Sequence, residues 1–184
     1  FASCGQDSAA DCLENKLTAA KVVCDLQRIP NIPTITKVRV LSLHQQLIRL
    51  DFEEALPEFE SHLLLEKFTQ QLQQSNVIIL SDYAKGSARH APQLIQLAKQ
   101  ANIPVFVDPK GQDFNKYRGA TLLTPNRKEF EAVVGVCRDE DELVQKGKAL
   151  LRTLNIEALL ITRGEQGMTL IRENYPELHL PARA

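Results

Sequence analysis

Polar residues and glycines able to meet an anionic ligand follow directly after four short apolar runs of this sequence. They occupy residues 82–86, 108–111, 124–126 and 162–167. Ligands of an open parallel sheet bind beyond the carboxyl ends of its strands, so these four segments are expected to meet at one edge of a sheet. The ammonium groups of Lys85 and Lys110 could neutralise phosphate there, and glycines let backbone N–H groups approach it. The sequence therefore indicates a site for an anion such as a phosphate group.

Several of these residues also have an ordinary structural interpretation. Asn126, followed three positions later by Glu129, has the pattern of a helix capping box. Gly164 and Gly167 fit a plain turn between two strands. Single loop lysines are mostly solvated, and Asp82 suits the N-cap of a following helix. Taken one at a time, these residues leave both interpretations open.

Two familiar signatures of nucleotide-binding loops are absent from the sequence. The chain contains neither Gly-x-x-x-x-Gly-Lys-Ser/Thr nor Gly-x-Gly-x-x-Gly. A phosphoryl-transfer enzyme with this sequence would therefore hold its nucleotide in another way.

The composition excludes several classes of protein. The chain has 184 residues, of which 43% are hydrophobic and 24% charged, as expected of one globular domain. Lys and Arg (22) nearly balance Asp and Glu (23), so the net charge gives no indication that the protein binds nucleic acid or an anionic membrane. No apolar run approaches the ~20 residues of a membrane span. We expect a soluble, cytoplasmic protein that binds neither nucleic acid nor membrane.

The cysteines and histidines show no metal-binding pattern. They are Cys4, Cys12, Cys24 and Cys137, and His44, His62, His90 and His179. No Cys-x-x-Cys pair occurs, which argues against a zinc site and against a disulfide framework. Reduced thiols fit a cytosolic protein.

Strand-like and helix-like patterns alternate from about residue 75 onward. Short apolar runs rich in branched residues predict buried strands. These runs lie at 76–81, 103–108, 121–124, 157–162 and 168–172. Apolar residues on one helical face predict helices between the runs, the longest from Glu140 to Leu154. The alternation predicts an α/β fold with a mostly parallel sheet and helices on both of its faces.

The region before residue 60 has a different pattern. Residues 33–41 and 45–51 alternate between apolar and polar side chains around a short turn. This period of two, with one polar face, predicts an antiparallel β-hairpin that would serve as a lid or small subdomain. The basic residues of its polar face, Lys37, Arg39 and Arg49, fit solvent exposure and ligand contact equally well.

Two motifs give the sequence a resemblance to a known family. Residues 124–130, Thr-Pro-Asn-Arg-Lys-Glu-Phe, resemble the Asn-x-x-Glu element of the ribokinase or PfkB-like carbohydrate kinases, and residues 162–167 resemble their Thr-x-Gly-x-x-Gly turn. The hairpin is similar to that family's lid. Four longer stretches are similar to the kinase half of the bifunctional heptose 7-phosphate kinases/heptose 1-phosphate adenylyltransferases of lipopolysaccharide synthesis. These stretches are 33–40, 45–54, 80–86, and 108–111 with 117–120.

The resemblance covers nearly the whole chain and implies a ribokinase-like fold that is incomplete at both ends. It makes residues 1–184 part of one kinase domain, with the lid at about 33–54 and the nucleotide-binding half at about 76–172. The reaction it implies transfers the γ-phosphate of ATP to O1 of D-glycero-β-D-manno-heptose 7-phosphate. The product, the 1,7-bisphosphate, serves ADP-heptose and lipopolysaccharide core synthesis.

The resemblance also assigns roles to single residues on the nucleotide side. The candidates are Asn126, Arg127, Lys128, Glu129, Thr162, Gly164 and Gly167. Asn126 and Glu129 would act near Mg²⁺ and the nucleotide phosphates, with Glu129 reaching the metal through water. Thr162 and Gly164 would approach ATP.

Candidates for the phosphosugar side are chosen on chemical grounds. Basic groups suit a 7-phosphate, and a carboxylate suits sugar hydroxyls. The candidates are Lys37, Arg39, Arg49, Asp82 and Lys85. Because members of the family pair through the lid, the resemblance also implies a homodimer formed through the hairpin.

Two parts of the family pattern do not occur in the sequence. They are a glycine-rich sugar-binding stretch near the amino end and a Gly-Ala-Gly-Asp turn after the last strand. The N–H groups of that turn would hold the developing anion, and its Asp would take the hydroxyl proton. We therefore expect no catalytic base within this chain, and no kinase activity from the chain alone.

Two other functions stay open at this point. One is a different ribokinase-like kinase that acts on another phosphosugar or on a nucleoside. The other is a non-catalytic remnant that binds nucleotide or nothing, which the absent turn favours for the chain as it stands.

Overall fold

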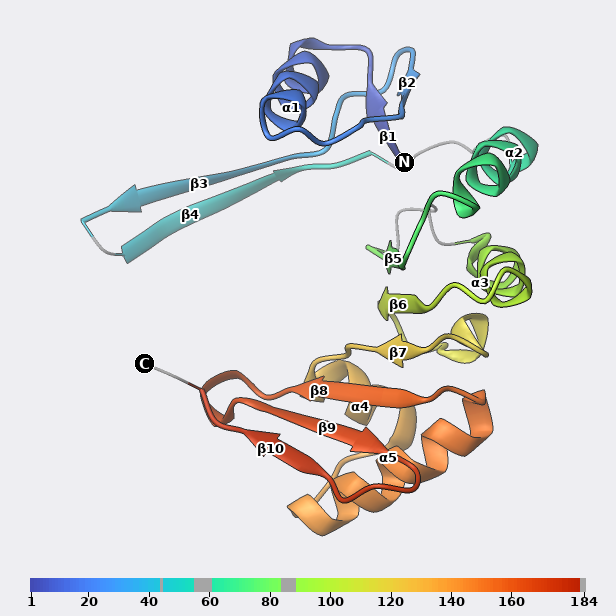
Figure 1. Ribbon diagram of the computed structural model, residues 1–184. Helices are drawn as coiled ribbons and strands as arrows, with labels where there is room; N and C mark the ends of the chain where they lie inside the picture. The colour runs from blue at the N-terminus through green and yellow to red at the C-terminus, as the bar shows by residue number, and fades with distance from the viewer. Residues whose placement is uncertain (44, 55–60, 84–88, 183–184) are drawn as a thin grey trace. The chain divides into compact units, whose positions relative to one another are not determined.

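The computed structural model describes residues 1–43, 45–54, 61–83 and 89–182 of the chain. The chain divides into two compact units, Phe1–Phe59 and Glu60–Ala184, and each contains both helix and sheet (Figure 1). Among these residues, no helix has both the length and the apolar character that crossing a membrane requires.

The first unit combines a small parallel sheet with one helix. Strand β1 (Ala2–Gly5) pairs with β2 (Leu26–Ile29), and α1 (Ser8–Ala19) connects them. Asp7 caps α1, and its two carboxylate oxygens also accept hydrogen bonds from the N–H and the hydroxyl of Thr34, each at 2.7 Å. These bonds, with those from Thr34 contributing most, lower the pKa of Asp7 to about 2. They tie the start of the helix to the segment that leads into the hairpin.

An antiparallel hairpin completes this unit (Figure 1). Strand β3 (Thr36–Ser42) pairs with β4 (Gln45–Phe52), so the hairpin predicted from the alternating sequence is confirmed. One of its faces is apolar and includes Val38, which lies opposite Leu50. The two side chains are 39% and 41% exposed, so within the described residues this face stays largely open to solvent.

The second unit is built on a six-stranded sheet. Its strands are β5 (Ile78–Ser81), β6 (Val105–Asp108), β7 (Leu122–Leu123), β8 (Ala158–Thr162), β9 (Met168–Arg172) and β10 (Leu178–Leu180). The order across the sheet is β10-β9-β8-β7-β6-β5. Strands β5 to β8 are parallel, whereas β9 and β10 are each antiparallel to their neighbours. The mostly parallel sheet predicted from the sequence is confirmed.

In the described part of this unit, one α-helix precedes the parallel strands, and three α-helices connect them. They are α2 (Ser61–Leu72) before β5, α3 (Ala91–Gln100) between β5 and β6, and α4 (Arg127–Val134) with α5 (Glu140–Leu154) between β7 and β8. Crossovers between parallel strands are right-handed. Because β5, β6, β7 and β8 follow one another in a single direction across the sheet, their crossover helices lie on one face (Figure 1).

The hydrophobic core lies between this face and the helices. Val107, Leu123 and Leu159 point into it from successive strands, and none of the three is exposed to solvent. Gly147 lets α5 approach closely, because a Cβ added there would lie 2.5 Å from Cδ1 of Ile171 on β9. The close contact fixes α5 against the end of the parallel sheet.

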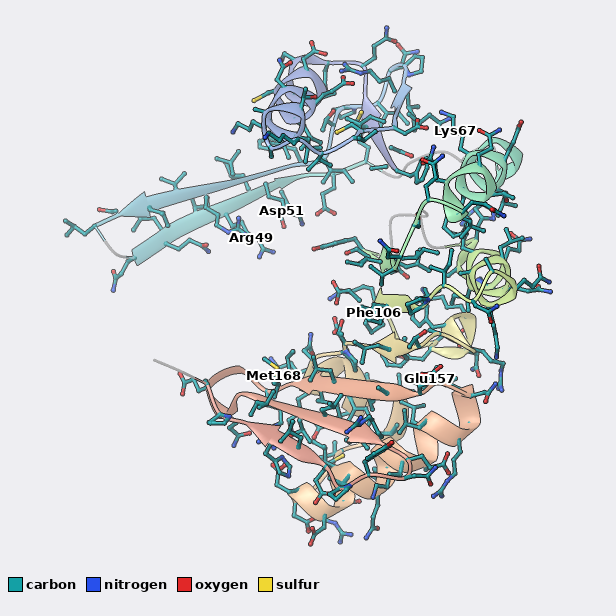
Figure 2. All side chains as sticks on the ribbon, in the orientation of Figure 1. Arg49, Asp51, Lys67, Phe106, Glu157 and Met168 are labelled. Carbon is teal, nitrogen blue, oxygen red and sulfur yellow. The ribbon has the colours of Figure 1, made fainter. Side chains whose placement is uncertain are left out.

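The opposite face of the sheet is apolar and partly exposed. Phe106 alternates with the buried Val107 and so faces away from the core (Figure 2). Its neighbour on β5, Ile79, is 71% exposed, and Leu178 on β10 is 50% exposed. The sequence predicts helices on both faces, but the described helices of this unit pack on one. The reason is that the order of β5 to β8 never reverses direction.

Matched leucine substitutions test this one-sided core. Leu159→Ala should lower the free energy of unfolding by about 2–5 kcal/mol, because the lost side chain leaves a cavity in the packed face. Leu178→Ala, at a half-exposed site, should cost less than about 1 kcal/mol. Urea unfolding of both variants measures the difference, and equal losses would contradict the assignment of faces.

Candidate functional site

A pocket of about 350 Å³ opens where the parallel strands of the second unit end. It is lined by Asp82, Tyr83, Asp108, Pro109, Lys110, Thr124, Asn126, Glu129 and Thr162. These residues come from the carboxyl ends of β5, β6, β7 and β8 and from the start of α4. As predicted, the structure brings residues from each of the four polar segments to one edge of the sheet.

Asn126 and Glu129 form the capping box that the sequence predicts. Asn126 Oδ1 accepts a hydrogen bond from Glu129 N at 2.9 Å, and Glu129 Oε2 accepts one from Asn126 N at 3.0 Å. The second oxygen, Oε1, lies 2.7 Å from Lys110 Nζ inside the pocket. Capping and lining the pocket are therefore compatible, because they use different oxygens of one carboxylate.

The carboxylates around the pocket affect one another. Burial raises the pKa of Asp108, and the negative charge of Glu129 adds to this effect. The hydrogen bond and charge of Glu129 raise the pKa of Lys110, which keeps its ammonium protonated. The pocket thus contains a cation, Lys110, and two nearby carboxylates, Asp108 and Glu129, whose mutual repulsion a second cation would reduce.

Asp82 is held in place by residues that the sequence reasoning did not assign to the site. Its side chain is almost fully buried, and its Oδ2 accepts hydrogen bonds from Lys116 Nζ and the Tyr117 hydroxyl, each at 2.6 Å. Tyr117 is completely buried and its hydroxyl also accepts from Lys110 N at 3.2 Å. The structure does not support Asp82 as a helix N-cap, because α3 begins after His90. Asp82 instead lines the pocket.

The turn after β8 brings only part of its motif to the pocket. Thr162 lines the pocket, and its N–H donates to Pro125 O at 3.0 Å, which joins β8 to the start of α4. Gly164 and Gly167 form the turn itself, with φ of +60° and +81°. Neither of these glycines is among the residues that line the pocket.

Arg127 and Lys128 point elsewhere than the pocket. Arg127 Nε donates to Glu131 Oε1 at 3.0 Å, and its Nη2 donates to Cys137 O at 3.1 Å. The bond to Glu131 raises the pKa of Arg127. Lys128 is exposed on α4. Neither residue lines the pocket, so a contribution from them would come through the backbone or through charge.

The basic candidates of the hairpin lie on its charged face. Lys37 Nζ donates to Glu53 Oε1 at 2.6 Å, and Arg49 Nη2 lies 3.0 Å from Asp51 Oδ2 (Figure 2). Arg39 lies directly opposite Arg49 in the strand register. Lys85, the remaining basic candidate, lies outside the described residues.

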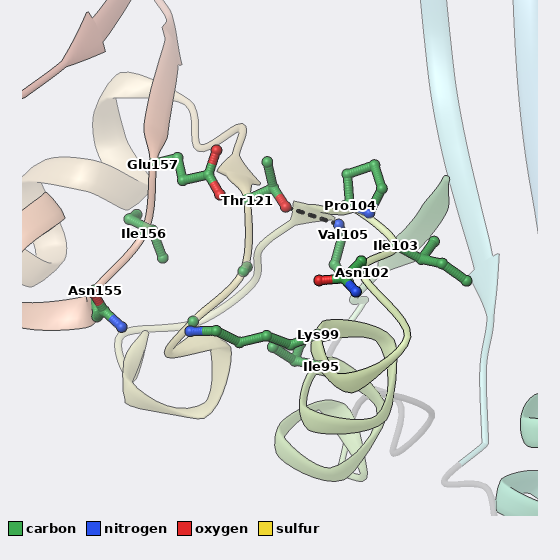
Figure 3. A pocket seen from close by; sticks show the side chains of 12 residues that line it. Ile95, Lys99, Asn102, Ile103, Pro104, Val105, Thr121, Asn155, Ile156 and Glu157 are labelled. Carbon is green, nitrogen blue, oxygen red and sulfur yellow. Dashed lines mark hydrogen bonds between the residues drawn. The ribbon is translucent and has the colours of Figure 1, made fainter. Parts of the chain in front are cut away.

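A second pocket of about 410 Å³ lies at the opposite edge of the same sheet, where the strands begin (Figure 3). Lys99, Asn155 and Glu157 line it, and Thr121 Oγ1 accepts a hydrogen bond from Val105 N there at 3.0 Å. None of the predicted site residues lines this pocket. The residues singled out by sequence therefore belong to the carboxyl edge.

The donors of the carboxyl-edge pocket suit Mg²⁺. This ion prefers oxygen ligands and is usually held by one or two carboxylates together with water and substrate phosphates. Asp108 and Glu129 supply such carboxylates. In the described part of the chain, no group of three or more His, Cys, Asp or Glu side chains is placed to hold a metal alone. The residues fit a magnesium ion that is shared with a nucleotide.

Comparison with known proteins decides the family. Residues 1–183 match the model of the pfkB family carbohydrate kinases. The chain belongs to the pfkB family of carbohydrate kinases. The Bifunctional protein HldE of Aeromonas hydrophila subsp. hydrophila is 60% identical over 180 residues, and that of Alcanivorax borkumensis is 57% identical over 180 residues. Each match covers 98% of this chain but 38% of the relative, so the chain spans well under half the length of these relatives.

A solved ribokinase structure shares the fold. Arabidopsis thaliana ribokinase, complexed with ribose and ATP, matches with a TM-score of 0.76 at 20% identity, over 98% of this chain and 60% of the ribokinase. The predicted ribokinase-like fold is confirmed. The resemblance to the bifunctional heptose kinases, drawn from four stretches of sequence, is confirmed by the HldE relatives.

The two turn glycines should differ sharply when each is replaced by alanine. A Cβ at Gly167 would lie 1.9 Å from Leu180 O, whereas a Cβ at Gly164 would meet nothing within 4 Å. Gly164→Ala should cost about 1–2 kcal/mol for its positive φ alone. Gly167→Ala should cost more than about 3 kcal/mol, because the backbone must also move. Chemical unfolding of both variants gives the comparison, and similar losses would show that the turn has another shape.

Proposed function

We propose that this chain is the middle portion of the kinase half of a bifunctional enzyme of lipopolysaccharide synthesis. The kinase transfers the γ-phosphate of ATP to O1 of D-glycero-β-D-manno-heptose 7-phosphate and so makes the 1,7-bisphosphate for ADP-heptose. The observation that carries this proposal is the pocket in which Asn126, Glu129 and Thr162 meet, in a member of a carbohydrate kinase family. The identity to HldE proteins supports the choice of a heptose phosphate as substrate.

The pocket would bind the phosphates of ATP together with Mg²⁺. Asn126 and Glu129 would face the metal and the phosphates, Glu129 through water, with its position held by the capping box. Thr162 would contact the nucleotide, Gly164 would let the backbone approach it, and Gly167 completes the turn. When bound, Mg²⁺ supplies positive charge that offsets the developing charge on the transferred phosphoryl group.

Arg127 and Lys128 would assist from outside the pocket. Both lie in the first turn of α4, whose N-terminus is positive through its dipole and faces the pocket through Asn126. Their charges add to that potential without a direct contact. The N-terminal end of α4 thus favours an anionic ligand.

The sugar phosphate would be held by Asp82 and by basic groups. Asp82 lines the pocket and would accept hydrogen bonds from sugar hydroxyls. Four basic side chains would bind the 7-phosphate: Lys37, Arg39, Arg49 and Lys85. In this proposal residues 1–184 are part of one kinase domain, with the lid at about 33–54 and the nucleotide-binding half at about 76–172.

A kinetic assay tests the proposed substrate and the role of the missing motif. The full-length protein that carries this chain should release ADP with D-glycero-β-D-manno-heptose 7-phosphate, with a kcat/KM at least about 100-fold above that with fructose 6-phosphate. The 184-residue chain alone should release no heptose-dependent ADP. Its sequence lacks the Gly-Ala-Gly-Asp turn whose donors and Asp the transfer requires.

Three other results would change the proposal. A preference for another phosphosugar or a nucleoside would keep the chain a kinase but replace its substrate. Steady heptose-dependent ADP release by the 184-residue chain would refute its inactivity. A full-length protein that binds Mg-ATP without turnover of any sugar would support a non-catalytic nucleotide-binding role.

We also propose a cytoplasmic homodimer formed through the hairpin. Its apolar face carries Val38, Val40, Ile48 and Leu50, and all four side chains are at least 39% exposed. A second copy of the same hairpin would bury this face by a self-complementary contact. The opposite, charged face would remain available to the sugar phosphate.

Charge placed on the apolar face should prevent this pairing. Ile48→Lys with Leu50→Lys should shift the protein from dimer to monomer in light scattering coupled to size-exclusion chromatography, because like charges would meet in a desolvated contact. Arg49→Gln, between them on the other face, is the matched control and should stay dimeric. Dimers of unchanged stability in the double lysine variant would rule out the hairpin as the interface.

A further inference from the structure

Lys110 and Glu129 form an ion pair inside the pocket, and their side chains differ in solvent exposure. Their Nζ and Oε1 atoms lie 2.7 Å apart, and the Lys110 side chain is 51% exposed whereas that of Glu129 is 15% exposed. Glu129 is also fixed by its hydrogen bond from Asn126 N. The lysine is therefore the partner that can leave, and the carboxylate is the partner that stays.

The backbone from which Lys110 projects is anchored separately. Lys110 N donates to the hydroxyl of the fully buried Tyr117, and that hydroxyl donates to Asp82 Oδ2 at 2.6 Å. The same oxygen accepts from Lys116 Nζ. A change of partner by Lys110 thus requires rotation of one flexible side chain and leaves the loop where it is.

The charges of the pocket set up two competitions. Asp82, Asp108 and Glu129 place carboxylates around a pocket whose described lining includes the single basic side chain of Lys110. A nucleotide phosphate and Glu129 would compete for the Lys110 ammonium, since both are anionic acceptors. Mg²⁺ and Lys110 would compete for the Oε1 side of Glu129, since both are cations.

We propose that Lys110 is a catalytic-site cation that exchanges partners, pairing with Glu129 in the nucleotide-free protein and with the terminal phosphate of the bound nucleotide, while Glu129 stays in place and would be neutralised by Mg²⁺ when the metal is present. The inference rests on the proposed function, because it needs ATP and Mg²⁺ in this pocket. It adds a residue from the loop after β6 to the phosphate-binding set. The exchange keeps Glu129 neutralised before the nucleotide binds and releases the ammonium to the phosphate afterwards.

A purely structural ion pair is the competing explanation. In that case Lys110 stays on Glu129 throughout and only holds the loop after β6 against the start of α4. The two explanations differ in how the two residues influence the affinity for ATP without metal. Only an exchanging lysine predicts that the gain in ATP affinity from Glu129→Gln disappears when Lys110 is absent.

A double-mutant cycle on ATP affinity separates the explanations. Calorimetry with ATP in EDTA should use the full-length protein as wild type, Lys110→Met, Glu129→Gln and the double variant. Lys110→Met should weaken metal-free binding about tenfold, and Glu129→Gln should tighten it about tenfold by releasing the lysine. When Lys110→Met is already present, the gain from Glu129→Gln should largely vanish, because no ammonium remains to be released.

Two control variants guard against loss of fold and general charge effects. Lys110→Arg keeps the charge and should bind metal-free ATP within about threefold of wild type. Lys99→Met removes an exposed lysine that lines the opposite pocket, so it should leave the affinity unchanged. Thermal melting of each variant confirms that the compared proteins are folded.

The outcomes distinguish this inference from the proposed function. ATP affinity that Lys110→Met leaves unchanged would overturn the inference alone, and so would a gain from Glu129→Gln that persists in the double variant. The second result would mean that Glu129 acts only by repelling the phosphates. A wild-type protein that fails to bind ATP with or without Mg²⁺ would overturn both the inference and the proposed function.

Discussion

The parallel hydrogen bonding of β5 to β8 is the constraint on which the candidate site depends. It aligns the ends of the strands, so that Asp82 N donates to Asp108 O at 2.9 Å and Thr162 N donates to Pro125 O at 3.0 Å. Residues up to 80 positions apart in the sequence thereby line one pocket. The core on the helical face holds this alignment, because each strand contributes buried side chains to it. The chemistry of the pocket follows from which residues stand at those ends.

Glu129 shows how structure and function can share one side chain. The capping box uses Oε2 and leaves Oε1 for Lys110 in the pocket. A capping glutamate is held rigidly by backbone bonds, which is what a phosphate or metal site needs, since a positioned group loses little entropy on binding. The structure is therefore compatible with both interpretations that the sequence left open. Tyr117 likewise has two roles, because it fills the core and also orients Asp82 and Lys110.

The sequence predicts correctly those elements whose structure is determined by a local pattern. Buried parallel strands are apolar runs, the hairpin alternates in period two, and the capping box is a three-residue spacing. Lys116 and Tyr117 were missed because their partner Asp82 lies more than 30 positions away, across a short 3₁₀ turn without a periodic signal. The placement of helices was also beyond local pattern, because it follows from the order of strands in the sheet.

Hydrogen–deuterium exchange with and without Mg-ATP tests the central claim, that the carboxyl-edge pocket binds the nucleotide. The full-length protein should show nucleotide-dependent protection concentrated in peptides that cover 108–111, 124–129 and 162–167. Lys110→Met should reduce that protection at a fixed, subsaturating concentration of ATP. Protection confined to peptides around Lys99 and Glu157 at the opposite edge, or no protection at all, would contradict the account.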